Sequence, residues 1–227
     1  MTDFLIQHFP NVISLKEEFI QSTIETLYMT FWTAIIAGVL GILLGVILVV
    51  TGKNGVLENR PLYNVLDKLV NIFRSIPFII MIAVIVPFTR FLVGTSIGTT
   101  AALVPLVVGT TPFFARQIQN ALLEVDSGVI EAAESMGVGP FGIIFRVYLK
   151  EGLVSIVRVS ALTIINLIGL TTMAGAIGGG GLGNLAISRG YNRFQTDVTL
   201  VATIIILVLV FISQFASNLI IKKITHD

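Results

Sequence analysis

The sequence has no cysteine and very little charge. Asp, Glu, Lys and Arg make up 12% of the 227 residues, about half of the roughly 25% that soluble domains carry. Without cysteine, disulfides and thiolate metal sites are excluded, and a net charge of +1 gives no basis for binding nucleic acid. The chain is 55% hydrophobic with a mean hydropathy of +0.95. It therefore predicts a membrane protein whose main solvent is lipid.

Groups that support catalysis or ion coupling are also scarce. The two histidines, His8 and His226, stand at opposite ends of the chain, so we expect no metal site and no bound cofactor. No Asp or Glu falls in the middle of a predicted span, where proton- or sodium-coupled carriers usually need such a group or a broken-helix ion site. The Gly178–Gly181 run lacks the Lys-Ser or Lys-Thr of a phosphate-binding loop. We therefore expect no enzymatic activity and an energy source outside this chain.

Five apolar runs are long enough to cross a membrane core of about 30 Å, which takes a helix of roughly 20 residues. They predict one all-α transmembrane domain over residues 1–227. The spans cover roughly 23–52, 69–88, 98–123, 152–177 and 198–221. The second span is the least regular, because Arg74 interrupts it. The first residues lack a basic stretch leading into an apolar core, so no cleavable signal peptide is expected.

Glycines and prolines indicate where these helices pack closely or end. Gly41 and Gly45 in the first span have a spacing that lets helices approach closely, and we favour packing within the chain over a role in dimerisation. Pro77 and Pro87 predict kinks or helix ends, since each removes a backbone donor. The Gly178–Gly181 run is expected to break the fourth helix.

The basic residues predict the orientation. Lys and Arg gather on the cytoplasmic side of membrane proteins, and five spans place the two termini on opposite sides. With the N-terminus outside, ten of the 14 Lys and Arg fall inside: Lys53, Arg60, Lys68, Arg74, Arg116, Arg146, Lys150, Arg158, Lys222 and Lys223. We therefore predict an N-out/C-in protein with residues 124–150 in the cytoplasm. The polar segment after the first span has a turn signal at Asn54-Gly55, and a helix along the membrane surface is expected up to Lys68.

The longest polar interruption, Leu123–Lys150, is predicted to begin with a short helix. Asp126 or Ser127 can cap a helix that starts at Gly128. Gly137 is placed to end this helix in a left-handed conformation.

A second helix is predicted from Pro140 to Lys150, with proline in its first turn after Gly139. An apolar face at helical spacing is expected to lie on the bundle, with Arg146 and Lys150 turned away. That face consists of Phe141, Ile144, Phe145 and Tyr148.

The first helix carries a motif. Glu131-Ala132-Ala133, followed three residues later by Gly137, is similar to the EAA motif of permease subunits in bacterial ABC importers. The resemblance implies that Glu131, Ala132, Ala133 and Gly137 couple the permease to its ATPase, because the EAA helix of the family docks in a cleft of that subunit.

The rest of the motif matches with one departure. Val147 and Leu149 stand where the family has Ile and Leu, but Lys150 replaces the proline. This replacement puts in question the bend that normally follows the motif.

The resemblance extends over all of the chain except its first ~20 residues. The segments that carry it resemble the permease of the bacterial methionine importer: residues 71–80, 87–90, 94–98, 121–124 and 174–183. This implies the type I fold of ABC importer permeases in the bacterial cytoplasmic membrane. It also implies a second copy of the chain, two cytoplasmic ATPase subunits that use ATP and Mg²⁺, and an external substrate-binding lipoprotein. The implied substrate is a small amino acid, methionine above all, with other neutral amino acids or small solutes as the alternative.

Polar and soft side chains near the predicted spans are candidates for the substrate pathway or its gate, although packing between helices is favoured for each of those in the fourth and fifth spans. They are Arg74, Pro77, Asn166, Thr171, Thr172, Met173, Ser213 and Gln214. Arg74 has two interpretations, reaching the membrane interface or pairing with a carboxylate inside the bundle. Two other functions remain open from the residues alone: a channel or carrier that works without an ATPase, and a membrane scaffold.

Overall fold

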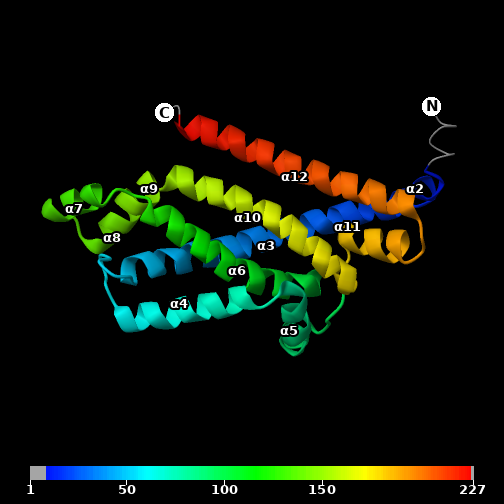
Figure 1. Cartoon of the computed structure of the whole chain (residues 1–227), viewed down its shortest axis with the longest axis horizontal. Coiled ribbons are helices and arrows are strands. Elements are labelled where there is room, and N and C mark those ends of the chain that lie inside the picture. The colour runs from blue at the N-terminus through cyan, green and yellow to red at the C-terminus, as the bar shows by residue number, and fades with distance from the viewer. Residues whose placement is uncertain (1–8, 226–227) are drawn as a thin grey trace. The chain divides into compact units, whose positions relative to one another are not determined.

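The computed structural model describes residues 9–225 as helices and connecting loops, with no strand in that range (Figure 1). His8 and His226 lie outside the described residues, as do the first eight residues of the segment used to predict the absence of a signal peptide. The helices form two compact units. The first comprises the residues up to 35, 77–108 and 164–214, and the second comprises 36–76, 109–163 and the residues from 215 on.

Within the described residues, four helices are long and apolar enough to cross a membrane. They are α3 (Lys16–Thr51), α6 (Thr99–Leu123), α10 (Leu153–Ala174) with its π-helical extension η2 (Gly175–Gly179), and α12 (Thr196–Thr225). A fifth span requires α4 (Arg60–Ser75) and α5 (Phe78–Val93) to be taken as a pair. The all-helical prediction is therefore confirmed, whereas the predicted span over 69–88 is divided between two helices.

Pro77 causes this division. Ile76 adopts an extended conformation with ψ of 122°, as the residue before a proline tends to do. Pro77 itself has ψ of 131° and precedes the first residue of α5. The prediction of a helix end is thus confirmed at Pro77, whereas Pro87 lies inside α5.

The first unit contains two apolar clusters, one of which holds short helical segments against the long helices. In one cluster, Phe19 of α3 and Val198 of α12 are buried with Leu182 of α11 (Gly181–Asn184) and Leu185 of the π-helical segment η3 (Leu185–Tyr191). The other cluster consists of Met29, Ala102, Leu106, Leu167 and Ala174. A short N-terminal helix, α2 (Pro10–Ser14), is tied to this unit because Asp197 accepts hydrogen bonds from the backbone of Asn11 and Val12.

The glycine run breaks the fourth long helix as predicted. Gly178, Gly180 and Gly181 have φ of 97°, 80° and 74°, values that other residues rarely adopt. The backbone after the break is held by α3: Glu25 Oε2 accepts from Gly181 N at 2.7 Å, and Thr26 Oγ1 accepts from Leu182 N at 2.9 Å. Side chains of α3 thereby satisfy two amides that a helix start leaves without partners.

The second unit is built around one apolar cluster. Val49 and Val50 of α3 and Ile118 and Leu122 of α6 are buried there together with residues of the segment that follows α6. This segment comprises α7 (Ser127–Ser135), α8 (Pro140–Ile143), the π-helical turn η1 (Ile144–Tyr148) and α9 (Leu149–Glu151). The turn predicted at Asn54-Gly55 is present, with Asn54 at φ of 62° and its N–H donated to Glu58 Oε2 at 2.9 Å.

Gly41 and Gly45 let α3 and α6 pack closely in this unit. A Cβ on Gly41 would lie 2.6 Å from the Phe114 ring, and a Cβ on Gly45 would lie 2.7 Å from Ile118 Cβ and 2.8 Å from the backbone oxygen of Ala115. The packing interpretation of these glycines is therefore confirmed. Gly38, one turn earlier, has no such neighbour within 4 Å.

This difference gives a matched pair of substitutions. Gly45→Ala should lower stability by about 1–3 kcal/mol, because the added carbon meets the α6 backbone and cannot be accommodated by a rotamer change. Gly38→Ala should leave stability unchanged or raise it by about 0.5–1 kcal/mol, since alanine favours helix. Thermal unfolding of the detergent-solubilised protein measures both. Equal effects of the two substitutions would contradict the close approach at Gly45.

Candidate functional site

The helix that carries the EAA-like residues begins with a side-chain cap. Asp126 is the cap residue, and its Oδ1 accepts a hydrogen bond from Gly128 N at 2.6 Å. Of the two predicted caps, Asp126 is thus the one used, and α7 begins at Ser127, one residue earlier than expected. The carboxylate also places negative charge at the positive end of the helix dipole.

The same helix ends in the left-handed turn predicted at Gly137. Gly137 has φ of 78° and donates its N–H to Glu134 O at 2.9 Å, while Val138 N donates to Ala133 O at 3.0 Å. These two bonds form a Schellman motif, which satisfies carbonyls that a helix end would otherwise leave free. Val138 and Ala133 also pack in the same apolar cluster, which is the apolar contact that accompanies this motif.

The EAA-like residues divide between a buried side and an exposed side of α7. Ala133 is 5% exposed and belongs to the apolar cluster of the second unit. Glu131 and Ala132 are exposed, and Ser135 donates its hydroxyl to Glu131 O at 2.8 Å. The helix is therefore fixed to the unit along Ala133 and presents Glu131 and Ala132 outward.

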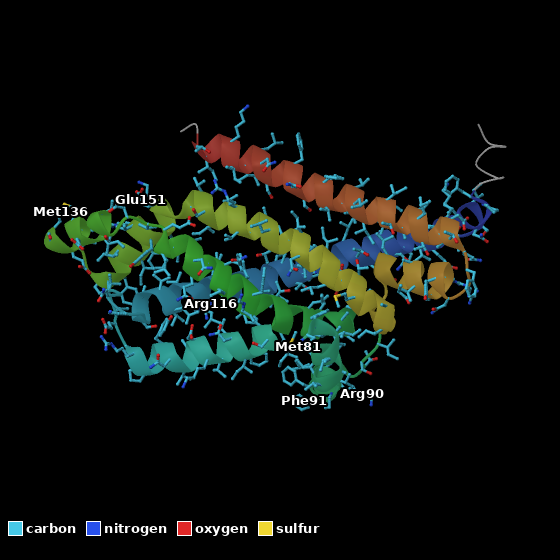
Figure 2. All side chains as sticks on the ribbon, in the orientation of Figure 1. Met81, Arg90, Phe91, Arg116, Met136 and Glu151 are labelled. Atoms are coloured by element: carbon cyan, nitrogen blue, oxygen red, sulfur yellow. The ribbon has the colours of Figure 1, made fainter. Side chains whose placement is uncertain are left out.

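Large apolar side chains of this segment are also exposed. Met136, at the end of α7, is 76% exposed (Figure 2), and Val129, Phe141 and Phe145 are exposed as well. Scattered apolar residues are normal on a protein surface. Here, however, they lie in the same segment as the exposed Glu131 and Ala132. The segment thus offers a mixed apolar and acidic surface.

The second predicted helix differs from the expectation in two ways. It is divided into α8, η1 and α9, and its buried residues are Ile143, Ile144, Val147 and Tyr148. The predicted face was wrong at Phe141 and Phe145, which are 72% and 67% exposed. The segment is apolar on several sides, so periodicity could not choose between two faces that share Ile144 and Tyr148. Arg146 and Lys150 are exposed as predicted.

Tyr148 anchors this segment in a neutral form. Its side chain is 6% exposed within the apolar cluster. Burial raises the pKa of the Tyr148 hydroxyl, and the negative charge of Glu134 raises that pKa further. The phenol therefore stays protonated throughout the physiological pH range.

The chain turns into α10 at Gly152 rather than at Lys150. Lys150 lies inside α9, and Gly152 N donates to Tyr148 O at 3.0 Å. A Cβ on Gly152 would lie 2.9 Å from the Leu122 side chain, so glycine permits this turn to lie against the end of α6. Lys150 thus lies within a helical turn, and α10 begins at Leu153.

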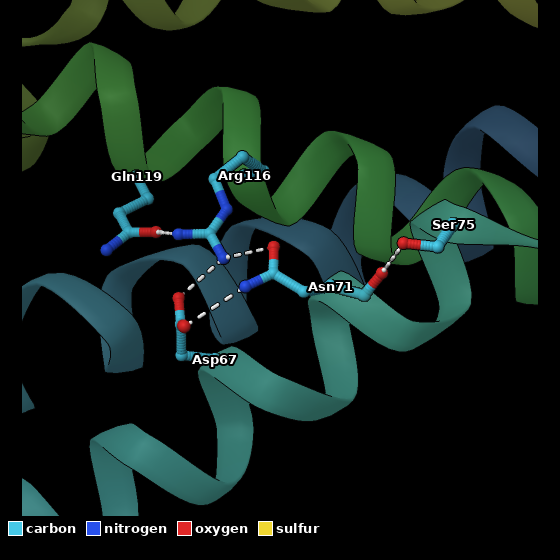
Figure 3. A network of polar contacts seen from close by, with 5 residues as sticks. All are labelled: Asp67, Asn71, Ser75, Arg116 and Gln119. Carbon is cyan, nitrogen blue, oxygen red and sulfur yellow. Dashed lines mark hydrogen bonds and ion pairs between the residues drawn. The ribbon is translucent and has the colours of Figure 1, made fainter.

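A polar network that was not predicted joins α4 to α6 (Figure 3). Arg116 of α6 donates to Asp67 Oδ1 at 2.6 Å, to Asn71 Oδ1 at 3.1 Å and to Gln119 Oε1 at 2.6 Å. The side chains of Arg116 and Asp67 are 16% and 26% exposed. The sequence could indicate that Asp67 and Asn71, four residues apart, share one side of a helix, but it does not identify Arg116 as their partner.

Unlike Arg116, Arg74 has no carboxylate or side-chain amide partner among the described residues. It is exposed at the end of α4 and forms no ion pair among the described residues. Three other arginines pair with a carboxylate among the described residues, namely Arg60, Arg116 and Arg189, and the Arg116 side chain is the least exposed of the three. Pro77, the second candidate here, is exposed at the break between α4 and α5.

The remaining pathway candidates lie on α10 and α12 of the first unit. Thr171 and Thr172 both donate their hydroxyls to Ile168 O, at 2.7 and 3.1 Å, so these groups are used within their own helix. Asn166 and Met173 are exposed, and their spacing of seven residues places them on one side of α10. Gln214 is exposed on α12 next to the partly buried Ser213.

The described residues contain no group of three or more His, Asp or Glu side chains that could hold a metal ion.

The chain matches a known family and several relatives. The family model described as "binding-protein-dependent transport system inner membrane component" covers residues 37–226. The probable D-methionine transport system permease protein MetI of Pasteurella multocida is 48% identical over 205 residues, 90% of this chain and 94% of that protein. The methionine import system permease protein MetP of Bacillus subtilis is 49% identical over 214 residues, 94% of this chain and 96% of that protein.

A solved structure has the same fold. One chain of the inward-facing MetNI methionine ABC transporter superposes with a TM-score of 0.91 at 41% identity, over 93% of this chain and 98% of that one.

The left-handed residue that ends α7 gives a testable prediction. Gly137→Ala should lower the free energy of opening α7 by about 1–2 kcal/mol, because a Cβ is disfavoured at this φ, and no neighbouring atom lies within 4 Å to add a clash. Hydrogen exchange of the α7 amides measures this opening. The control is Gly139→Ala, which also has open space and an ordinary φ of −69°. Equal acceleration of exchange in the two variants would contradict the role of the left-handed turn.

Proposed function

Because the chain belongs to the family of inner membrane components of binding-protein-dependent transport systems, we propose that it is the permease subunit of an ATP-driven ABC importer for methionine. The observation that supports this most strongly is the identity of 48% and 49% to methionine permeases over at least 90% of the chain. Those permeases match this chain over nearly their full length, so the proposal rests on the whole permease rather than on one motif.

We propose that the chain is a multi-pass protein of the bacterial cytoplasmic membrane with five spans, N-out and C-in. The fifth span is supplied by α4 and α5 together. The excess of basic residues on one side supports this orientation. In this arrangement α7 and the segment up to Lys150 lie in the cytoplasm, on the side where ATP is available.

The proposed complex contains two copies of this chain, two ABC ATPase subunits that use ATP and Mg²⁺, and an external substrate-binding lipoprotein. The chain itself supplies no nucleotide site, in agreement with the missing phosphate-binding motif. The similarity to a chain of the MetNI methionine ABC transporter supports an assembly with separate ATPase subunits.

Coupling is assigned to α7. In this proposal the exposed Glu131 and Ala132 enter a cleft of the ATPase, while the buried Ala133 and the turn at Gly137 hold the helix on the permease. Closure of the ATPases on ATP would draw the two α7 helices together and open the outer side of the pathway. The firm attachment of α7 to an apolar cluster supports this role, because a loosely held helix would absorb the movement.

The pathway is assigned to exposed residues on α10 and at the break between α4 and α5. Asn166 and Met173 share an exposed side of α10, and Arg74 and Pro77 lie at the break between α4 and α5. Thr171 and Thr172 on α10 and Ser213 and Gln214 on α12 complete the proposed set of pathway residues. Methionine is a zwitterion with an apolar tail, so a pathway with few charges suits it.

Uptake by reconstituted vesicles tests the function. Vesicles that contain this chain with its ATPase, supplied with ATP and the external binding protein, should accumulate labelled methionine, and unlabelled methionine should compete better than leucine. Uptake should require the ATPase, since this chain has no energy source of its own.

Two outcomes contradict the proposal in different ways. Transport by the purified chain alone would favour a channel or carrier that works without an ATPase. ATP-dependent uptake of leucine with no competition by methionine would keep the importer and exclude methionine as the substrate.

A further inference from the structure

The glycine run that follows α10 does not determine its own conformation. Gly178, Gly180 and Gly181 have positive φ, but glycine adopts negative φ about as readily. A run of such residues has many conformations of similar free energy, so contacts from outside the run must select the observed one. One of these contacts comes from Gly98, which donates its N–H to Gly178 O at 2.9 Å.

Glu25 of α3 supplies a charged contact to this run. Its Oε2 accepts from Gly181 N at 2.7 Å, and its Oε1 accepts from Gln21 Nε2 at 3.0 Å. Glu25 forms no ion pair among the described residues, so these two donors are its partners there. The adjacent Thr26 accepts from Leu182 N with a neutral hydroxyl. Because bonds to an ionised acceptor are about twice as strong as neutral ones, the contact of Glu25 is the stronger of the two.

The helix that begins after the run is packed directly on the backbone of the helix before it. A Cβ on Gly183 of α11 would overlap the backbone oxygen of Thr172 in α10. A Cβ on Gly175 of η2 would lie 2.6 Å from Asn184 N in α11. The two backbones therefore approach as closely as glycine allows. A shift of α11 cannot leave the end of α10 unchanged, because packed backbones have no room to slide past each other.

We propose that Glu25 is a positioning residue for the pathway candidates at the end of α10, which are Thr171, Thr172 and Met173. Its carboxylate holds the start of α11, and α11 in turn fixes the backbone of α10 on which these residues stand. The contact itself does not depend on what the protein transports, whereas its part in transport rests on the proposed function. Without the carboxylate the glycine run is free to adopt other conformations, and the end of α10 loses its fixed position.

Spin labels on single cysteines test this assignment, because the chain has no cysteine of its own. Met173→Cys places a label at the end of α10, and Asn166→Cys places a reference label about two turns earlier on the same side of the helix. Both positions are exposed. Each is combined with Glu25→Ala, which removes the acceptor, and separately with Glu25→Gln, which keeps an uncharged one. Every variant is assembled with its ATPase in vesicles.

Glu18→Gln is the matched control. Glu18 is a second carboxylate of α3, and it accepts from Arg189 of η3 with both oxygens, at 3.0 and 2.8 Å. It thus joins α3 to the other end of the segment that begins at Gly181, away from the glycine run. If the carboxylates of α3 only stabilise the fold, the two substitutions should affect the label at position 173 alike. If Glu25 positions the end of α10, only its own substitution should affect that label.

With Glu25→Ala the label at position 173 should gain a mobile spectral component that the label at position 166 lacks. Hydrogen exchange at the amides of Gly181 and Leu182 should accelerate about tenfold or more, the factor expected for one lost bond to a charged acceptor. Glu25→Gln should show both effects to a smaller extent, and it decides the question if Glu25→Ala does not assemble. An unchanged spectrum at position 173, an equal change at position 166, or an equal effect of Glu18→Gln would overturn the inference.

Methionine uptake by vesicles with the unsubstituted chain separates this inference from the proposed function. The expected spectra without any ATP-driven uptake would retain the positioning of α10 by Glu25 and contradict the importer. Intact uptake with unchanged spectra would contradict the positioning and retain the importer. Where both hold, Glu25→Ala should lower the methionine taken up per ATP hydrolysed, and Glu18→Gln should not. An unchanged ratio in Glu25→Ala would overturn the part of Glu25 in transport.

Discussion

A hydrocarbon surrounding provides no hydrogen-bond partners, so every polar group placed within it must find one in the protein or in enclosed water. Two contacts in this chain meet that requirement directly. Arg116 is bound by Asp67, Asn71 and Gln119 on one side of α6. At the glycine break, the carboxylate of Glu25 accepts from the first amide of α11. Only 12% of the residues are charged. Several of these charged residues stabilise contacts between helices or the start of a helix within a largely apolar protein.

The same requirement explains why the surface around α7 is different. There the chain leaves Glu131 without an ion pair among the described residues and exposes Met136, Phe141 and Phe145. These groups suit a surface that meets water and a protein partner. The buried Ala133 and Tyr148 fix this surface to the long helices through one apolar cluster. In the proposed coupling, a movement imposed on α7 would reach α6 and α10 with little local deformation, because packed cores do not deform continuously.

Much of the arrangement was predictable because it depends on local rules. The cap at Asp126, the left-handed end at Gly137 and the break at the glycine run each follow from one residue type and its backbone preferences. The face of the segment after Pro140 was not predictable, since it is apolar on several sides and only contact with α6 selects Ile143 and Val147. The Asp67–Arg116 pair joins residues 49 positions apart, and no local pattern encodes such a contact. The proposal that α7 meets an ATPase comes from the resemblance to a family, since neither composition nor spacing indicates a partner.

The central claim is that the exposed side of α7 is where the ATPase acts on this chain. A photo-reactive residue at Ala132, in the complex assembled with its ATPase, tests this contact directly, and the same residue at Glu151 is the control because Glu151 is exposed in the same segment. The account predicts a covalent product between position 132 and the ATPase, with little or none from position 151. A product from position 151 and none from position 132 would contradict it.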